Sequence, residues 1–284
     1  IGVVPYADSV YHNLVIKDKD TVLNFIATID KESKRSTPNH SKDRLKHALF
    51  FGCSITFGEG VQDNETMPYY FQEISQEYNS YNFGLSGHAT NHMLARLQFK
   101  PLKSQVTEEN GVAFYIFFWD HIYRSIGSMN RYCDWLHNAP YYYLKNDKLY
   151  RNKMFCDGRR KISWIYENLY QTNIVKNFKI DFPIKINKTH LNLVAEMIKE
   201  SKLEYQRQYP NNEFYCVLYP EWAKEKDGLN EDLKIVLKEK GIKFIDLTWF
   251  EYKKEHTLGL DPHPNPKTHH KIASIIFEKL KSKN

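Results

Sequence analysis

A serine in a glycine-flanked turn is the first residue of this chain suited to chemistry. Ser54 lies in the segment FGCSITFG, residues 51–58, directly after a short apolar run. Ligands of open parallel sheets bind at the carboxyl ends of strands, so Ser54 stands where a nucleophile would be presented. A serine in a turn is more often a cap or turn residue, so this motif needs a base elsewhere in the chain.

A base and a group to orient it stand near the other end of the chain. The segment LDPHPN, residues 260–265, contains Asp261 and His263 on a loop stiffened by prolines. A histidine can take the proton of a serine hydroxyl, and a carboxylate can hold its ring in place. Asp and Pro are also common at helix starts, so capping alone would account for this motif. Together, the two motifs predict a Ser54–His263–Asp261 triad for acyl transfer.

Strands and helices alternate between these motifs. Apolar runs predict buried strands, and amphipathic periodicity predicts helices between them. The strands are expected at 46–52, 81–84, 112–119, 214–219 and 243–247, and the helices at 66–78, 89–100, 161–177, 189–208, 231–240 and 269–280. This alternation is typical of an α/β fold in which a mainly parallel sheet is covered by helices on both faces, a three-layer α/β/α sandwich.

Two regions lie outside this alternation. Residues 1–45 are predicted to form a small β-rich N-terminal extension, and 46–284 a single domain. Residues 125–160 are interpreted as an insertion over the sheet edge, with a β-hairpin turning at Asn146 and Asp147. Its aromatic side chains would either pack on the body or stack on sugar rings, packing being the commoner role.

Composition excludes several classes of protein. The 284 residues carry 40 Lys and Arg against 34 Asp and Glu, an excess too dilute for a nucleic-acid binder. No apolar run is long enough to span a membrane.

The four cysteines are too few for a disulfide scaffold, although Cys133 and Cys156 could pair in an oxidising compartment. The first residue is Ile1 and not Met, which leads us to expect a removed leader or anchor. The oligomeric state is not indicated.

No cofactor or metal is expected. The sequence has no Cys-x-x-Cys pair and no glycine-rich phosphate loop. His88 and His92 are four apart on a predicted helix, and His269 and His270 are adjacent, but neither pair has a further ligand at metal-site spacing. We interpret all four as structural or substrate-facing.

The motifs together resemble those of the SGNH/GDSL hydrolase family. The first block is matched by Gly52, Ser54, Ile55, Thr56 and Gly58, and the last by Asp261, His263, Pro264 and Asn265. The stretch 82–87 is similar to the second block. The resemblance implies a flavodoxin-like α/β/α fold with the triad above. It also implies an oxyanion hole formed by the backbone N–H groups of Ser54 and Gly87, with Gly84 as the alternative to Gly87.

The chain departs from the family pattern at three places. Cys53 replaces an Asp beside the nucleophile, which also makes Cys53 itself a conceivable nucleophile. The Asp-x-His spacing is similar to that of polysaccharide O-acetylation enzymes. The stretch 117–124 lacks the third block's oxyanion-hole Asn. Ionised Asp120 has no proton to donate, so His121 or Arg124 would have to donate instead, with a purely structural His121 as the alternative.

The expected function is therefore that of a serine esterase or deacetylase. An acyl-enzyme on Ser54 would be hydrolysed by water, and the substrate would be a small-molecule or carbohydrate ester with a short acyl group. Two alternatives stay open: a carbohydrate O-acyltransferase using the same triad, and a non-catalytic carbohydrate-binding protein on the same fold. The resemblance implies an extracytoplasmic setting, periplasmic or secreted.

Overall fold

A parallel five-stranded sheet forms the centre of the molecule. The structure is a computed structural model that describes residues 2–17, 19–220 and 229–282. The strand order is β4-β3-β5-β8-β9, and every neighbouring pair is parallel. The strands are β3 (Lys46–Gly52), β4 (Tyr78–Gly84), β5 (Asn110–Phe117), β8 (Glu213–Leu218) and β9 (Phe244–Asp246). All five lie where the apolar runs predict strands.

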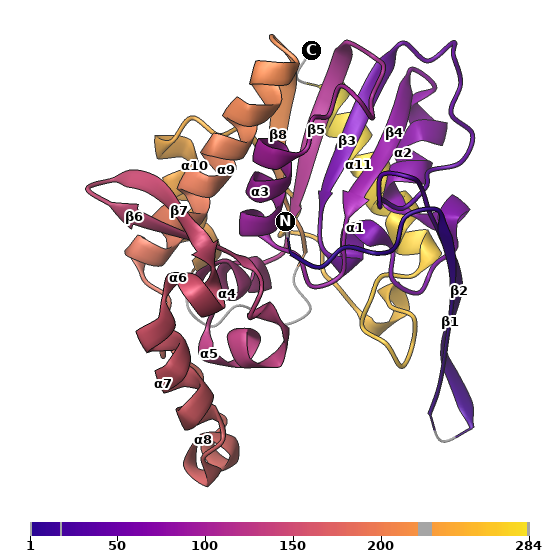
Figure 1. Ribbon diagram of the computed structural model, residues 1–284. Helices are drawn as coiled ribbons and strands as arrows, with labels where there is room; N and C mark the ends of the chain where they lie inside the picture. The colour runs from indigo at the N-terminus through magenta and orange to yellow at the C-terminus, as the bar shows by residue number, and fades with distance from the viewer. Residues whose placement is uncertain (1, 18, 221–228, 283–284) are drawn as a thin grey trace.

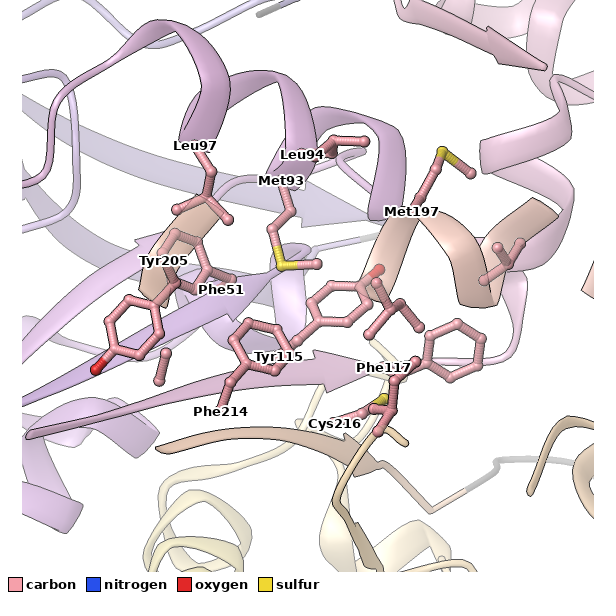
Figure 2. Close-up of a cluster of buried hydrophobic side chains, with 14 of the residues drawn as sticks. Phe51, Met93, Leu94, Leu97, Tyr115, Phe117, Met197, Tyr205, Phe214 and Cys216 are labelled. Carbon is pink, nitrogen blue, oxygen red and sulfur yellow. The ribbon is translucent and has the colours of Figure 1, made fainter. Parts of the chain in front are cut away.

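Helices cover both faces of this sheet, which confirms the three-layer α/β/α arrangement (Figure 1). Along β3 the side chains alternate, so that Leu49 and Phe51 face one core cluster while Ala48 and Phe50 face the other. The helices α3 (Thr90–Phe99), α9 (Lys188–Gln208) and α10 (Leu229–Glu239) pack on the first cluster. The helices α2 (Met67–Ser75) and α11 (Pro266–Lys281) pack on the second. Figure 2 shows Met93 and Leu97 among the side chains of the first cluster.

The short helix α1 (Ser54–Phe57) follows β3 without a linker and ends at Gly58, whose φ of 89° is left-handed. Glycines let this turn lie against the ends of two strands. A Cβ added to Gly52 would lie 2.1 Å from Thr56 Oγ1, and one added to Gly84 would lie 2.4 Å from the backbone nitrogen of Phe57. Any larger residue at these positions would push the turn away from the sheet.

The N-terminal region holds an antiparallel hairpin of β1 (Ser9–Lys17) and β2 (Asp20–Ile29), where a β-rich segment is predicted. Arg35 ties this hairpin to the turn after Ser54. Its side chain is fully buried and donates to the backbone carbonyls of Ile26, Phe57, Gly58 and Val61, and it forms an ion pair with Asp63 at 2.8 Å. The predicted division between an N-terminal extension and one domain at residue 45 stays a prediction.

The hairpin predicted inside the insertion is present. It consists of β6 (Pro140–Lys145) and β7 (Lys148–Met154), and Asn146 and Asp147 both have positive φ in the turn, which matches the type I′ geometry. Before it lie α4 (Asp120–Ile126), α5 (Met129–Arg131) and a π-helical turn (Tyr132–Leu136), and after it α6 (Phe155–Gly158). The hairpin is a separate two-stranded sheet.

Three expectations need correction. The single helix predicted over 161–177 is two helices, α7 (Arg160–Tyr170) and α8 (Asn173–Phe178), because Thr172 caps the second by accepting a hydrogen bond from the backbone of Val175. Cys133 and Cys156 are not paired; both are free thiols. His88 is expected on a helix with His92, but the helix predicted over 89–100 begins at Thr90, so His88 lies before it.

Candidate active site

The serine, histidine and aspartate singled out from the sequence form one chain of hydrogen bonds. His263 Nε2 lies 2.8 Å from Ser54 Oγ, and His263 Nδ1 lies 2.6 Å from Asp261 Oδ1. The same carboxylate oxygen accepts the backbone N–H of His263 at 2.8 Å. A carboxylate at Nδ1 fixes the ring with Nε2 free to accept a proton, which is what a general base for Ser54 requires.

The loop that carries the histidine is held by its own backbone. The nitrogen of Leu258 donates to the carbonyl of His263 at 3.0 Å, and the side chain of Asn265 donates to the carbonyls of Glu255 and Thr257. Asn265 also caps α11 by accepting from the backbone of Thr268. These bonds fix the backbone at His263, three residues before the start of α11, so the loop has little conformational freedom to lose in a reaction.

The helix after this loop docks on α2 through a second, buried histidine. His269 Nδ1 accepts the backbone N–H of Met67 at 3.2 Å, and its side chain is fully buried. Burial, aided by the nearby charges of Arg35 and His263, lowers the pKa of His269 to about 3. His269 is therefore a neutral structural residue. Its neighbour His270 is exposed.

Ser54 and His263 open into a pocket of about 520 Å³. Its other walls come from distant parts of the chain: the N-terminal segment, the turn after α1, the stretch that follows β4, helix α4 and the insertion. They are Val3, Glu59, Ser86, Gly87, His88, His92, Arg124, Trp135, Leu136, Asn138 and Ala139. The chemistry-bearing residues thus sit in a pocket that only the tertiary fold assembles.

The two glycines proposed for the oxyanion hole differ in what their N–H groups do. The N–H of Gly84 donates to Asn82 Oδ1 at 3.0 Å inside the structure, so it is already used. Gly87 lines the pocket in a left-handed conformation, with φ of 78°, and its N–H has no acceptor among the described residues. The N–H of Ser54, at the first position of α1, has no partner within its own helix. Gly87, and not Gly84, is therefore the glycine available beside Ser54.

Asp120 begins α4 and Arg124 lies in its last turn, and the two side chains have different positions. Asp120 Oδ2 accepts from Arg124 Nε at 2.7 Å, and Oδ1 accepts from Arg131 Nη2 at 2.9 Å, so this carboxylate is occupied by two guanidinium groups. Arg124 Nη1 donates to the carbonyl of His88 at 3.1 Å, and no described residue accepts from Nη2. Arg124 lines the pocket and Asp120 does not. The structure thus places a cation, held from two sides, in the pocket.

His121 does not reach the pocket. It is fully buried, its Nδ1 lies 2.8 Å from the hydroxyl of Tyr115, and no described residue bonds its Nε2. Burial lowers its pKa well below the usual value, so the ring is neutral. The expectation that His121 donates to an oxyanion does not fit this position; the structural alternative does.

His88 and His92 stack on one another, with ring centroids 4.1 Å apart. His88 Nε2 lies 2.8 Å from the carbonyl of Val3, and burial lowers the pKa of His88 to about 4. A Cβ on Gly2 would lie 2.8 Å from the ring of His92. The pair lies under the N-terminal segment and lines the pocket, so the prediction of structural or substrate-facing residues fits both.

Cys53 precedes Ser54 but is buried in the apolar cluster below the turn and does not line the pocket. Within the described residues, no group of three or more His, Cys, Asp and Glu side chains is arranged to hold a metal. Among the described helices, none has the length and apolar character needed to cross a membrane.

Sequence reasoning missed Trp135. This residue belongs to the π-helical turn of the insertion, is 44% exposed, and lies under the guanidinium groups of Arg124 and Arg131, whose centres are 5.8 and 5.3 Å from the ring centroid. A Cβ on Gly87 would lie 3.2 Å from its indole nitrogen. The only signal in the sequence was the aromatic richness of the insertion, which does not single out one residue.

Comparison with known protein families gives no match, and neither does comparison with curated proteins. Solved structures give distant likenesses. A lipolytic protein of the G-D-S-L family from Veillonella parvula is 15% identical with a TM-score of 0.45, over 83% of this chain and 98% of that one. An acetyl xylan esterase from the rumen bacterium Butyrivibrio proteoclasticus is 12% identical with a TM-score of 0.48, over 89% and 67%. A carbohydrate acetylesterase from Sinorhizobium meliloti is 11% identical with a TM-score of 0.46, over 84% and 100%. Likeness this distant says nothing about activity.

Proposed function

We propose that the protein is a serine ester hydrolase of the SGNH/GDSL type. The observation that carries this proposal is the unbroken hydrogen-bond chain from Ser54 Oγ through His263 to Asp261, opening into a pocket. If Ser54 were only a helix cap and His263 only a loop residue, nothing would require them to meet, because they are 209 positions apart in the chain.

In the proposed reaction, Ser54 Oγ attacks the acyl carbon while His263 Nε2 takes the hydroxyl proton. The ester C–O bond then breaks, and His263 returns the proton to the leaving alcohol. Water, deprotonated by His263, attacks the acyl-enzyme and releases the acid with Ser54 restored. Asp261 keeps its negative charge throughout and stabilises the imidazolium that forms at each step.

The oxyanion formed at the acyl carbon needs hydrogen-bond donors. We assign the backbone N–H groups of Ser54 and Gly87 to this role, and the Nη2 of Arg124 to the place of the missing side-chain donor. A guanidinium has donors to spare and keeps its charge at every working pH. In this assignment Asp120 is a positioning residue, because it holds Arg124 and has no contact with the pocket itself.

The test is labelling of Ser54 with a fluorophosphonate probe, located by peptide mass spectrometry. Wild type should carry the adduct on Ser54, and both Ser54→Ala and His263→Ala should lose it. Ser104→Ala, which removes an exposed hydroxyl far along the chain, is the matched control and should label as wild type. An adduct only on Cys53, or no adduct together with no turnover of acetyl esters, would overturn the proposal.

The unlabelled wild-type enzyme separates the remaining alternatives. Incubation with an acetyl ester, with and without a sugar acceptor, reports whether acetate or an acetylated sugar is formed. Release of acetate alone supports the hydrolase. Preferential acetylation of the sugar would assign the O-acyltransferase, and glycan binding without any turnover would assign a binding protein.

A further inference from the structure

A second hollow lies beside the active-site pocket and is lined mainly by apolar side chains. It measures about 540 Å³ and lies between the N-terminal segment, the β1–β2 hairpin and the turn after Ser54. Its apolar wall includes Phe25 and Ala27 of β2, Phe57 of α1, and Leu85 after β4. Of its polar side chains, His12 and Asn13 are on β1, and His12 is bonded to Asn24 at 2.9 Å.

This hollow, called here the hairpin cavity, adjoins the catalytic pocket. Val3, Glu59 and Ser86 line both of them. The hydroxyl of Ser86 donates to the carboxylate of Glu59, so the one charge on the shared rim is hydrogen-bonded. The backbone nitrogen of Glu59 in turn donates to the carbonyl of Ser54 at 3.0 Å. The rim between the two hollows is therefore one helical turn from the nucleophile.

The walls of the hairpin cavity are fixed. The carbonyl of Val3 is bonded by His88, and the nitrogen of Tyr6 donates to the hydroxyl of Tyr11 at 3.0 Å. On the other side, Asp63 accepts from the backbone of Thr28, and Arg35 bonds the carbonyl of Ile26. A cavity lined by apolar groups and held open by hydrogen bonds on both sides is suited to an apolar ligand.

We propose that the hairpin cavity binds an apolar chain of the ester substrate, with the chain passing the Val3 rim and the ester carbonyl at Ser54. This inference rests on the proposed function and deepens it. It replaces the expectation of a short acyl group with a preference for esters that carry a chain of several methylenes. Each methylene buried there should raise kcat/KM by about fourfold until the cavity is filled.

The first experiment is a chain-length series. Wild type is assayed with p-nitrophenyl acetate, butyrate, hexanoate and octanoate, and kcat/KM is expected to rise along the series. Ala27→Phe fills the cavity from β2 and should lower the octanoate-to-acetate ratio of kcat/KM by at least about tenfold. Val10→Phe is the matched control, because Val10 lies on the same hairpin but is 67% exposed and outside the cavity lining. Its ratio should equal that of wild type.

A second variant guards against misfolding. Ala27 is fully buried, so Ala27→Phe could disturb the hairpin itself. Asn13→Trp narrows the same cavity from a half-buried position on β1 and should lower the ratio in the same direction. Thermal unfolding of each variant checks that its fold is retained. If neither variant changes the ratio while both remain folded, the cavity does not bind the acyl chain of the substrate.

The chain could come from the acid or the alcohol part of the ester. Ethyl octanoate and octyl acetate place the same chain on opposite sides of the carbonyl, and each is compared with ethyl acetate. The ester whose advantage is lost in Ala27→Phe identifies the part that occupies the cavity. Acetate esters cleaved by Ser54 without any gain from either chain would overturn this inference and leave the proposed function standing. Absence of Ser54 labelling and of all turnover would overturn both.

Discussion

The two sides of the catalytic pocket are built in opposite ways. On the nucleophile side, Ser54 follows the core strand β3, His263 precedes the core helix α11, and the carboxylate that orients His263 is two residues away in the chain. On the facing side, Arg124 donates to the backbone carbonyl of His88, Trp135 packs against Arg124, and Val3 is bonded by His88. The difference indicates that the core sheet and its helices position the reacting groups, whereas the N-terminal segment and the insertion form the surface that contacts the substrate.

The largest effect should come from Ser54→Ala. Removing the nucleophile should lower kcat for any ester by about 10⁴- to 10⁶-fold, with thermal stability close to wild type because the hydroxyl is not part of the core. Steady-state assays with an acetyl ester check this, and Ser104→Ala again serves as control. Activity retained within tenfold would mean that the nucleophile side has been assigned to the wrong residue.

Arg124→Met should have the next largest effect. If its guanidinium donates to the oxyanion, kcat should fall by about 10²- to 10³-fold with little change in KM. Arg131→Met removes the other guanidinium on Asp120 and is the matched control, because Arg131 does not itself line the pocket; it should lose much less. A rise in KM with kcat intact would instead assign Arg124 to substrate binding and would sharpen the contrast between the two sides.

Acid should weaken the docking behind the nucleophile side. The pKa of His269 is about 3 in the folded protein, against about 6.5 when unfolded. The unfolded state therefore binds a proton first as pH falls, and stability present above pH 6.5 is lost progressively down to about pH 3. Between pH 7 and pH 5, this group should cost about 2 kcal/mol.

Urea unfolding at pH 7 and pH 5 measures that loss. His269→Gln should have a smaller difference between the two pH values than wild type, although lower stability overall, since the bond to Met67 is altered. His270→Gln changes the exposed neighbour and should keep the wild-type difference. An unchanged difference in His269→Gln would show that other groups dominate the acid response.

Trp135→Ala should have the smallest effect. It removes one face of the pocket and the aromatic ring below two guanidinium groups, which together contribute about 1 kcal/mol, so KM should rise by roughly fivefold to tenfold and kcat should change little. Trp135→Phe, which keeps an aromatic face, should recover most of the loss. A large fall in kcat for Trp135→Ala would contradict the proposal that the facing side only holds the substrate while the nucleophile side carries out the reaction.

The same contrast explains why the nucleophile side could be predicted from the sequence and the facing side could not. The strands and the Ser54 and His263 motifs are local patterns, in which glycines, prolines and apolar runs dictate the nearby backbone. The facing side is set by contacts between distant segments, such as Val3 with His88, for which a linear pattern has no signal. His121 illustrates the limit. Its place after β5 suggested a donor, but its ring turns into the core and bonds Tyr115.

Arg35 couples the stability of the turn after Ser54 to that of the N-terminal hairpin. All five of its N–H donors are used, four on backbone carbonyls and one on Asp63. Two of those carbonyls belong to Phe57 and Gly58, which end the nucleophile turn, and one to Ile26 of the hairpin. Opening either the turn or the hairpin would leave a buried charge and several carbonyls without hydrogen-bond partners. Both therefore belong to one cooperative unfolding unit. The nucleophile turn and the hairpin therefore persist or melt together.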